Sequence, residues 1–136
     1  MIDFVFLTRL ATRITQAAGK PATVVSAAPA GTYAWGSAGK RQDGMFEIQL
    51  NTAQPPAEFV FTYWHELGHL VRHGANKPIG IGIGLQNVDY MTDPELRESM
   101  RTVLVKREEE ADEYARMAAA AFERAAGMTL ERYLFG

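Results

Sequence analysis

The segment Tyr63-Trp64-His65-Glu66-Leu67-Gly68-His69-Leu70-Val71-Arg72-His73 contains all 3 histidines of the 136-residue chain. An α-helix turns by about 100° per residue, so His65 and His69 would lie on one face, one turn apart. Two imidazoles placed in this way can bind one metal ion, and Glu66 could then act as general base on a metal-activated water without being a ligand. The alternative is an amphipathic helix whose histidines share a face by chance.

Zinc is the expected ion. Imidazole and carboxylate ligands suit Zn²⁺, and a catalytic zinc site combines three protein ligands with one open position. The chain has no cysteine, so a thiolate zinc site and a disulfide are both excluded. The metal must therefore be held by histidine and carboxylate side chains.

His73 is the third histidine, but helix geometry excludes it from the same ion. It lies about 12 Å from His65 along a straight helix, whereas the ligands of one zinc ion lie within a few ångströms of one another. Gly74 follows as a helix-ending glycine, so an imidazole at position 73 can face the carbonyl end of the helix dipole. We expect His73 to have this capping role rather than to contact substrate.

The composition predicts a single domain over residues 1–136. A hydrophobic content of 47%, a charged content of 22% and a net charge of -2 are ordinary for a globular protein and provide no basic field for direct binding of nucleic acid. The apolar run before Arg9 is too short for a secretory signal, and no segment approaches the roughly eighteen apolar residues of a membrane span. We expect a cytoplasmic protein without membrane association, and the sequence does not indicate its oligomeric state.

The residues before the motif predict a helix and a small twisted sheet of about three strands. Asp3 can cap a helix over residues 4–18, which Gly19 ends. Residues 21–28 and 45–51 have strand patterns, and residues 32–35 have a weaker one because glycines follow it. Pro55-Pro56 then starts the motif helix.

The residues after the motif predict a flexible segment and further helices. Apolar residues alternate with glycine over 79–85, which favours an extended flap or a loosely held strand beside a cleft over a phosphate-binding loop. Thr92 or Asp93 can cap a helix towards Ala126, with a break near residues 106–110 as an alternative, and residues 129–135 predict a short last helix. The expected fold class is α+β.

The third ligand is expected in the acidic run at residues 108–113. If Tyr114 marks the interior face of a regular helix, Glu110 lies about 40° from it and Glu108 about 120° from it. A carboxylate on an apolar stripe needs a positive partner, so we predict that Glu110 completes the metal site. Glu108 would replace it if the helix has another phase or breaks near Arg107. The same arithmetic assigns flank or solvent positions to Glu109, Asp112 and Glu113.

Two motifs together resemble the ImmA/IrrE family of zinc metallopeptidases. They are His65-Glu66-Leu67-Gly68-His69 and the downstream Glu108-Glu109-Glu110-Ala111-Asp112-Glu113-Tyr114-Ala115. The resemblance covers roughly residues 45–118 and implies a zincin-like fold with an edge strand at 48–51. It also implies zinc ligation by His65, His69 and a glutamate of the 108–110 run, with Glu66 as the catalytic base. The chain departs from the family pattern in its long linker between the motifs and in the helical continuation after Ala115.

These features predict a zinc metallopeptidase that hydrolyses peptide bonds of a protein or peptide substrate. The resemblance implies a regulator or repressor as the target. Because the chain is expected to lack a helix-turn-helix domain, that target would be a separate protein. Extended substrate would pair with an edge strand, expected at residues 46–51. A non-catalytic, metal-stabilised regulatory or interaction module is the alternative, although such a site needs no base at Glu66. Four candidates for the oxyanion-stabilising donor stay open: Tyr63, Tyr90, Tyr114 and His73.

Overall fold

The computed structural model describes residues 1–76, 88 and 90–136. Within that part of the chain the order of elements is α1 (Phe4–Ala17), β1 (Thr23–Ala27), β2 (Gly36–Lys40), β3 (Phe46–Leu50), α2 (Pro56–His73), α4 (Pro94–Ala126) and α5 (Leu130–Phe135). The predicted α+β class is therefore confirmed. The glycine-alternating segment, residues 79–85, lies outside the described residues.

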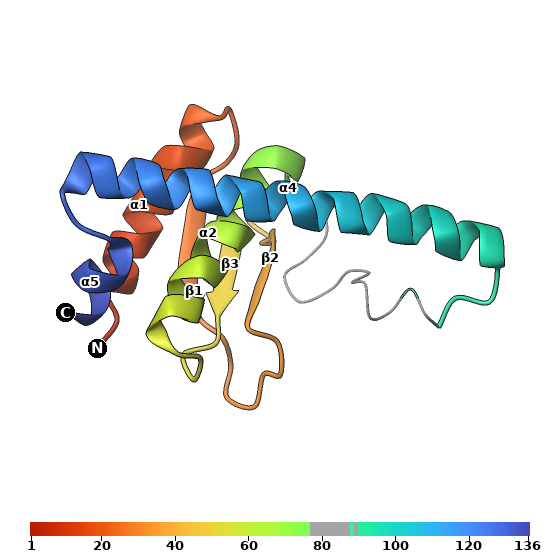
Figure 1. Cartoon of the computed structure of the whole chain (residues 1–136), viewed down its shortest axis with the longest axis horizontal. Helices are drawn as coiled ribbons and strands as arrows, with labels where there is room; N and C mark the ends of the chain where they lie inside the picture. The colour runs from red at the N-terminus through yellow and green to blue at the C-terminus, as the bar shows by residue number, and fades with distance from the viewer. Residues whose placement is uncertain (77–87, 89) are drawn as a thin grey trace.

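The sheet has the strand order β1-β3-β2, with β1 parallel and β2 antiparallel to β3 (Figure 1). The predicted strand at residues 45–51 is confirmed as β3, whose Phe46, Ile48 and Leu50 point into the core. The strand expected at residues 32–35 is wrong, since β2 begins only at Gly36. Glycine generally weakens a strand, but Gly36 is needed in this one. A Cβ there would collide with the side chain of Thr62 on α2.

The position of β3 overturns a second expectation. Residues 46–51 were expected to form the edge strand that pairs with substrate, yet β3 is the central strand and its hydrogen-bonding edges face β1 and β2. Among the described residues the outer strands are β1 and β2. Of these, β2 approaches the motif helix, because Gly36 lies against Thr62 and Glu66 of α2.

Helix α2 is largely enclosed by the other elements. Its Tyr63 and Leu67 have 0% of their surface exposed, and the Tyr63 hydroxyl donates a hydrogen bond of 2.9 Å to the carbonyl oxygen of Leu7 on α1. The helix ends as predicted at Gly74, which has a positive φ of 72°. These contacts fix the orientation of the opposite face of α2, which carries the histidines.

Helix α4 is one continuous helix of 33 residues that crosses α2 and extends beyond the rest of the protein (Figure 1). Asp93 caps it by accepting hydrogen bonds from the backbone N–H groups of Glu95 and Leu96, and Gly127 ends it with a φ of 75°. The helix does not break at residues 106–110. None of the helices in the described part of the chain combines the length and apolar character needed to cross a membrane.

Helices α2 and α4 approach each other closely at a glycine. A Cβ at Gly68 would lie 3.0 Å from the ring of Tyr114 and 3.2 Å from the carbonyl oxygen of Ala111. Ala111 and Ala115 are buried at the same contact. The small residues on both helices therefore let the histidine face of α2 meet the acidic run of α4.

Candidate metal centre

His65 and His69 converge as their spacing predicts. Both project from the same face of α2, and their Nε2 atoms lie 3.2 Å apart. Two ligands at 2.0–2.1 Å from a tetrahedral zinc ion are separated by about 3.3 Å. The two imidazoles are thus already placed for one ion.

Glu108 on α4 supplies a carboxylate to the same point. Its Oε2 lies 2.8 Å from Nε2 of His65, and its Oε1 lies 3.2 Å from Nε2 of His69. One donor atom from each of the three residues lies within 4.8 Å of the others, and this is the group in the described part of the chain that could hold a metal. The donor set of two imidazoles and one carboxylate fits a zinc site that keeps an open position.

The electrostatics of these residues favour a cation between them. Burial lowers the pKa of His65, but the hydrogen bond to Glu108 and the charges of nearby carboxylates outweigh it and raise this pKa to about 9. The hydrogen bonds from His65 and His69 hold the pKa of Glu108 well below its usual range. The Glu108 carboxylate would therefore stabilise positive charge at this point, whether from a second proton on His65 or from a metal dication.

Glu110, predicted as the third ligand, does not join this group. Its Oε2 lies 3.4 Å from Nε2 of His73. The structure brings Glu108, and not Glu110, to His65 and His69. The alternative that the sequence left open is the one observed.

The prediction of Glu110 was wrong because it assumed that Tyr114 marks the buried face of α4. Ala111 and Ala115 are buried, whereas Tyr114 is only partly buried. These alanines centre the interior stripe about 80° from Tyr114. Glu108 then lies about 40° from that centre and Glu110 about 120° from it.

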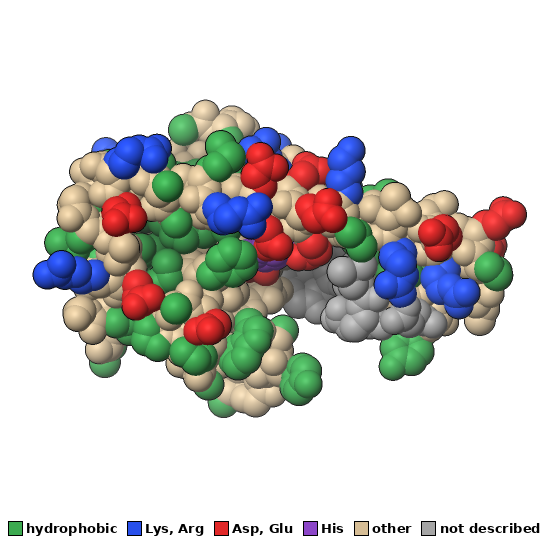
Figure 2. All heavy atoms as spheres, in the orientation of Figure 1, with side chains coloured by type: hydrophobic (Ala, Val, Ile, Leu, Met, Phe, Trp, Pro, Cys, Tyr) green, Lys and Arg blue, Asp and Glu red, His purple; other side chains and the backbone are tan. Residues whose placement is uncertain are grey.

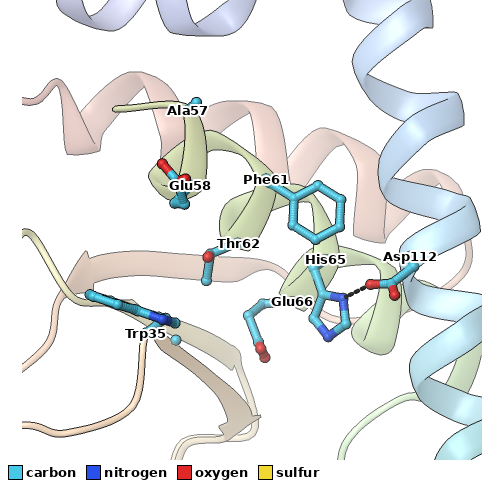
Figure 3. A pocket seen from close by; sticks show the side chains of 9 residues that line it. Trp35, Ala57, Glu58, Phe61, Thr62, His65, Glu66 and Asp112 are labelled. Carbon is cyan, nitrogen blue, oxygen red and sulfur yellow. Dashed lines mark hydrogen bonds and ion pairs between the residues drawn. The ribbon is translucent and has the colours of Figure 1, made fainter. Parts of the chain in front are cut away.

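Asp112 was assigned to the flank or the solvent, but it contacts a histidine of the cluster. Its Oδ1 lies 2.7 Å from Nδ1 of His65 (Figure 3). With the N–H of His65 on Nδ1, the ring donates to Asp112 and its Nε2 faces the metal position. The sequence contains a signal for this role. Glu108 and Asp112 are one helical turn apart, as His65 and His69 are, so each pair lies on one face of its helix.

His69 has a corresponding partner in His73. The Nδ1 atoms of the two rings lie 3.3 Å apart, and Nε2 of His73 faces Glu110. Burial lowers the pKa of His73, so its neutral form is favoured. One assignment of tautomers satisfies both hydrogen bonds: Nδ1 of His69 donates to Nδ1 of His73, and Nε2 of His73 donates to Glu110. The ring of His73 therefore orients the ring of His69, a role beyond the capping that the sequence predicted.

Glu66 lies beside the cluster without belonging to it. Its carboxyl group points into a pocket between Trp35 and His65 (Figure 3), and its Cγ is near Gly36 of β2. Burial raises its pKa from the ordinary value, against the opposing effect of the two histidines. A carboxylate with a raised pKa is a better proton acceptor, which is the property that a general base needs.

The pocket has a volume of about 520 Å³ and opens beside the histidines. It lies between the outer face of α2 and the chain before β2. Figure 2 shows carboxylate side chains gathered over the middle of α4, with a small patch of histidine surface below them. The pocket is lined by Trp35, Gly36, Ala57, Glu58, Phe61, Thr62, His65, Glu66 and Asp112.

The four candidates for an oxyanion-stabilising donor differ in their contacts and exposure in the structure. The Tyr63 hydroxyl is buried and committed to Leu7. Tyr90 is 84% exposed. Tyr114 packs against Gly68, with the Arg72 guanidinium 6.0 Å from its ring centre, and His73 contacts His69 and Glu110. The contacts of Tyr63 therefore make it a core residue.

Comparison of the chain with known protein families, with curated proteins and with solved structures finds no match.

Proposed function

We propose that this protein is a zinc-dependent metallopeptidase that hydrolyses peptide bonds of a protein substrate. The observation that carries the proposal is the convergence of His65, His69 and Glu108 next to Glu66 at the edge of an open pocket. The resemblance of the two motifs, which contain these residues, to the ImmA/IrrE family also supports it. That resemblance also favours a regulator or repressor as the substrate.

Different residues would bind the metal, orient its ligands and transfer the proton. His65, His69 and Glu108 would hold the ion, while Asp112 and His73 fix the orientation of the two imidazoles. A bound zinc ion would polarise the scissile carbonyl and lower the pKa of a water to about 7. Glu66 would accept the proton of the attacking water and then pass it to the leaving amine.

Strand β2 is the proposed guide for an extended substrate, because Gly36 at its start lies against Glu66 of α2. A peptide that adds to an exposed edge gains main-chain hydrogen bonds independently of its sequence. It would thereby be led past the proposed catalytic base.

The proposal is tested with Glu66→Gln and a proteome-derived peptide library. The amide keeps the shape of the carboxyl group but cannot accept a proton, so we expect one zinc per chain and a loss of turnover of about a hundredfold or more. Glu109→Gln, on the exposed side of α4, is the matched control. Wild-type turnover in zinc-loaded Glu66→Gln would refute the mechanism.

The second candidate is a metal-stabilised interaction module without catalysis. It is favoured by the outer half of α4, where Leu96 is 51% and Val103 is 47% exposed. A structural metal site needs no base and no adjoining pocket, which favours the peptidase. The module would show a rise in melting temperature with zinc but no release of peptides from the library.

A further inference from the structure

The pocket beside Glu66 has a fixed shape because a buried amide connects its two sides. The Gln54 side chain, only 5% exposed, donates a hydrogen bond of 3.0 Å to the carbonyl oxygen of Trp35. It also accepts one of 2.9 Å from the hydroxyl of Thr62 on α2. The backbone that carries the Trp35 indole is therefore held against α2.

Two aromatic side chains border the pocket. The side chains of Trp35 and Phe61 are 54% and 44% exposed, although large aromatic residues usually gain by burial. Figure 3 shows Trp35 and Glu58 on one side of the pocket, and Phe61 and His65 on the other. Two partly exposed rings that border one cavity are suited to hold an apolar chain between them.

Three acidic residues line the pocket. Within the described part of the chain its lining includes Glu58, Glu66 and Asp112 but neither lysine nor arginine. Asp112 is engaged by His65, and Glu66 is the proposed base. Glu58 has no ion-pair partner among the described residues, so its charge is free to meet that of a ligand.

We propose that this pocket binds a lysine or arginine side chain of the substrate next to the scissile bond, an inference that rests on the proposed peptidase function. The methylene stem would lie between Trp35 and Phe61, and the cationic head would meet Glu58 and the indole face. A cavity of about 520 Å³ accommodates the longest natural side chains. An acidic side chain would be repelled by Glu58, and a purely apolar one would leave Glu58 without a partner.

The test measures binding separately from hydrolysis. Zinc-loaded Glu66→Gln is titrated with peptides that are identical except for one residue, which is lysine, arginine, norleucine or glutamate. Trp35 fluorescence reports occupancy of the pocket. The other tryptophan, Trp64, is only 2% exposed, so its emission should stay constant during the titration. We expect lysine and arginine peptides to bind about tenfold more tightly than the norleucine peptide, with the glutamate peptide weakest. Equal affinity for lysine and norleucine would overturn the inference.

Two variants in the same background sharpen the test. Glu58→Gln should reduce the preference for lysine over norleucine to about threefold, and Glu58→Lys should favour the glutamate peptide over the lysine peptide. Glu109→Gln should leave the preference unchanged. An unchanged preference in both Glu58 variants would overturn the inference. Melting temperatures confirm that each variant is folded.

Failure of this inference can be told apart from failure of the proposed function. If wild-type protein hydrolyses peptides without preference for a basic residue, the pocket assignment is wrong and the peptidase stands. If the binding order holds but no peptide is hydrolysed, the pocket stands as a recognition site for basic peptides and the peptidase is wrong.

Discussion

The two faces of α2 differ in what they contribute. One face carries Phe59, Tyr63, Leu67 and Leu70, each at most 1% exposed, and it holds the helix in the core. The other carries the histidines and Glu66, which are only partly buried and contact carboxylates of α4 or face the pocket. Burying polar groups costs stability, whereas burying the apolar face provides it. Variants on opposite faces of one turn of this helix should therefore separate folding from metal binding.

The largest expected effect is on the histidine face. His65→Ala and Glu108→Ala should each weaken zinc binding on the order of a thousandfold, because each removes one of the three proposed protein ligands. Competition with a chromophoric chelator measures the affinity, and Glu109→Ala is the control. Loss of zinc from Glu110→Ala but not from Glu108→Ala would contradict the assigned ligand set.

Leu67→Ala tests the opposite face of the same helical turn. Leu67 is 0% exposed, so its truncation should lower the free energy of unfolding by about 2–5 kcal/mol. Zinc stoichiometry at saturating metal should stay at that of the wild type. Urea denaturation and metal analysis measure the two quantities. A variant that unfolds normally but loses its zinc would show that the two faces are not separable.

Gly68→Ala should affect both faces, since it lies where α2 meets α4. The added methyl group would be 3.2 Å from the carbonyl oxygen of Ala111, which as backbone cannot easily give way. We expect a loss of about 1–3 kcal/mol in the free energy of unfolding. To relieve the contact, α4 would have to move away from α2 and carry Glu108 with it, so zinc affinity should fall at the same time. Unchanged zinc affinity in a destabilised variant would mean that α4 adjusts without moving its acidic run.

The residues that orient the imidazoles should have a smaller effect than the ligands. Asp112→Asn and Glu110→Gln each weaken a hydrogen bond to a histidine and should reduce zinc affinity about tenfold. The absorption spectrum of the cobalt-substituted protein should shift as well, since ligand orientation changes. If neither variant changes the affinity or the spectrum, the imidazoles are oriented by packing alone.

The sequence predicted the local features of this site and failed where helix phase mattered. The spacing of His65 and His69 was sufficient to predict their convergence, and the cap at Asp93 and the expected extent towards Ala126 bounded α4 correctly. The choice between Glu108 and Glu110 depended on which face of α4 is buried. That face is selected by the close contact at Gly68, a tertiary feature that periodicity around Tyr114 does not contain.

The strand errors have the same origin. Gly36 looked like a residue that ends a strand, because glycine weakens strands in general. In the structure it is the residue that allows β2 to lie against Thr62 and Glu66. The order of the strands likewise depends on which neighbours pair. No local pattern in residues 46–51 identifies β3 as the central strand.

The smallest predicted effect concerns Tyr63, whose hydroxyl ties the core face of α2 to α1. Tyr63→Phe removes the 2.9 Å hydrogen bond and leaves the buried carbonyl of Leu7 without that donor, which should lower the free energy of unfolding by about 1 kcal/mol at neutral pH. Zinc affinity should not change.

Alkaline pH should reduce this difference between wild type and Tyr63→Phe. Burial raises the pKa of Tyr63 above its ordinary value of 10.0, so the folded state retains a proton that the unfolded state loses. The contribution of Tyr63 is therefore fully present below about pH 10 and is lost progressively as the pH rises from there towards the folded pKa. Phenylalanine has no such proton, and the remaining tyrosines are common to both proteins. Urea denaturation at pH 8 and above pH 10 should therefore give curves that converge. A constant difference would show that the hydroxyl titrates equally in both states and is not buried.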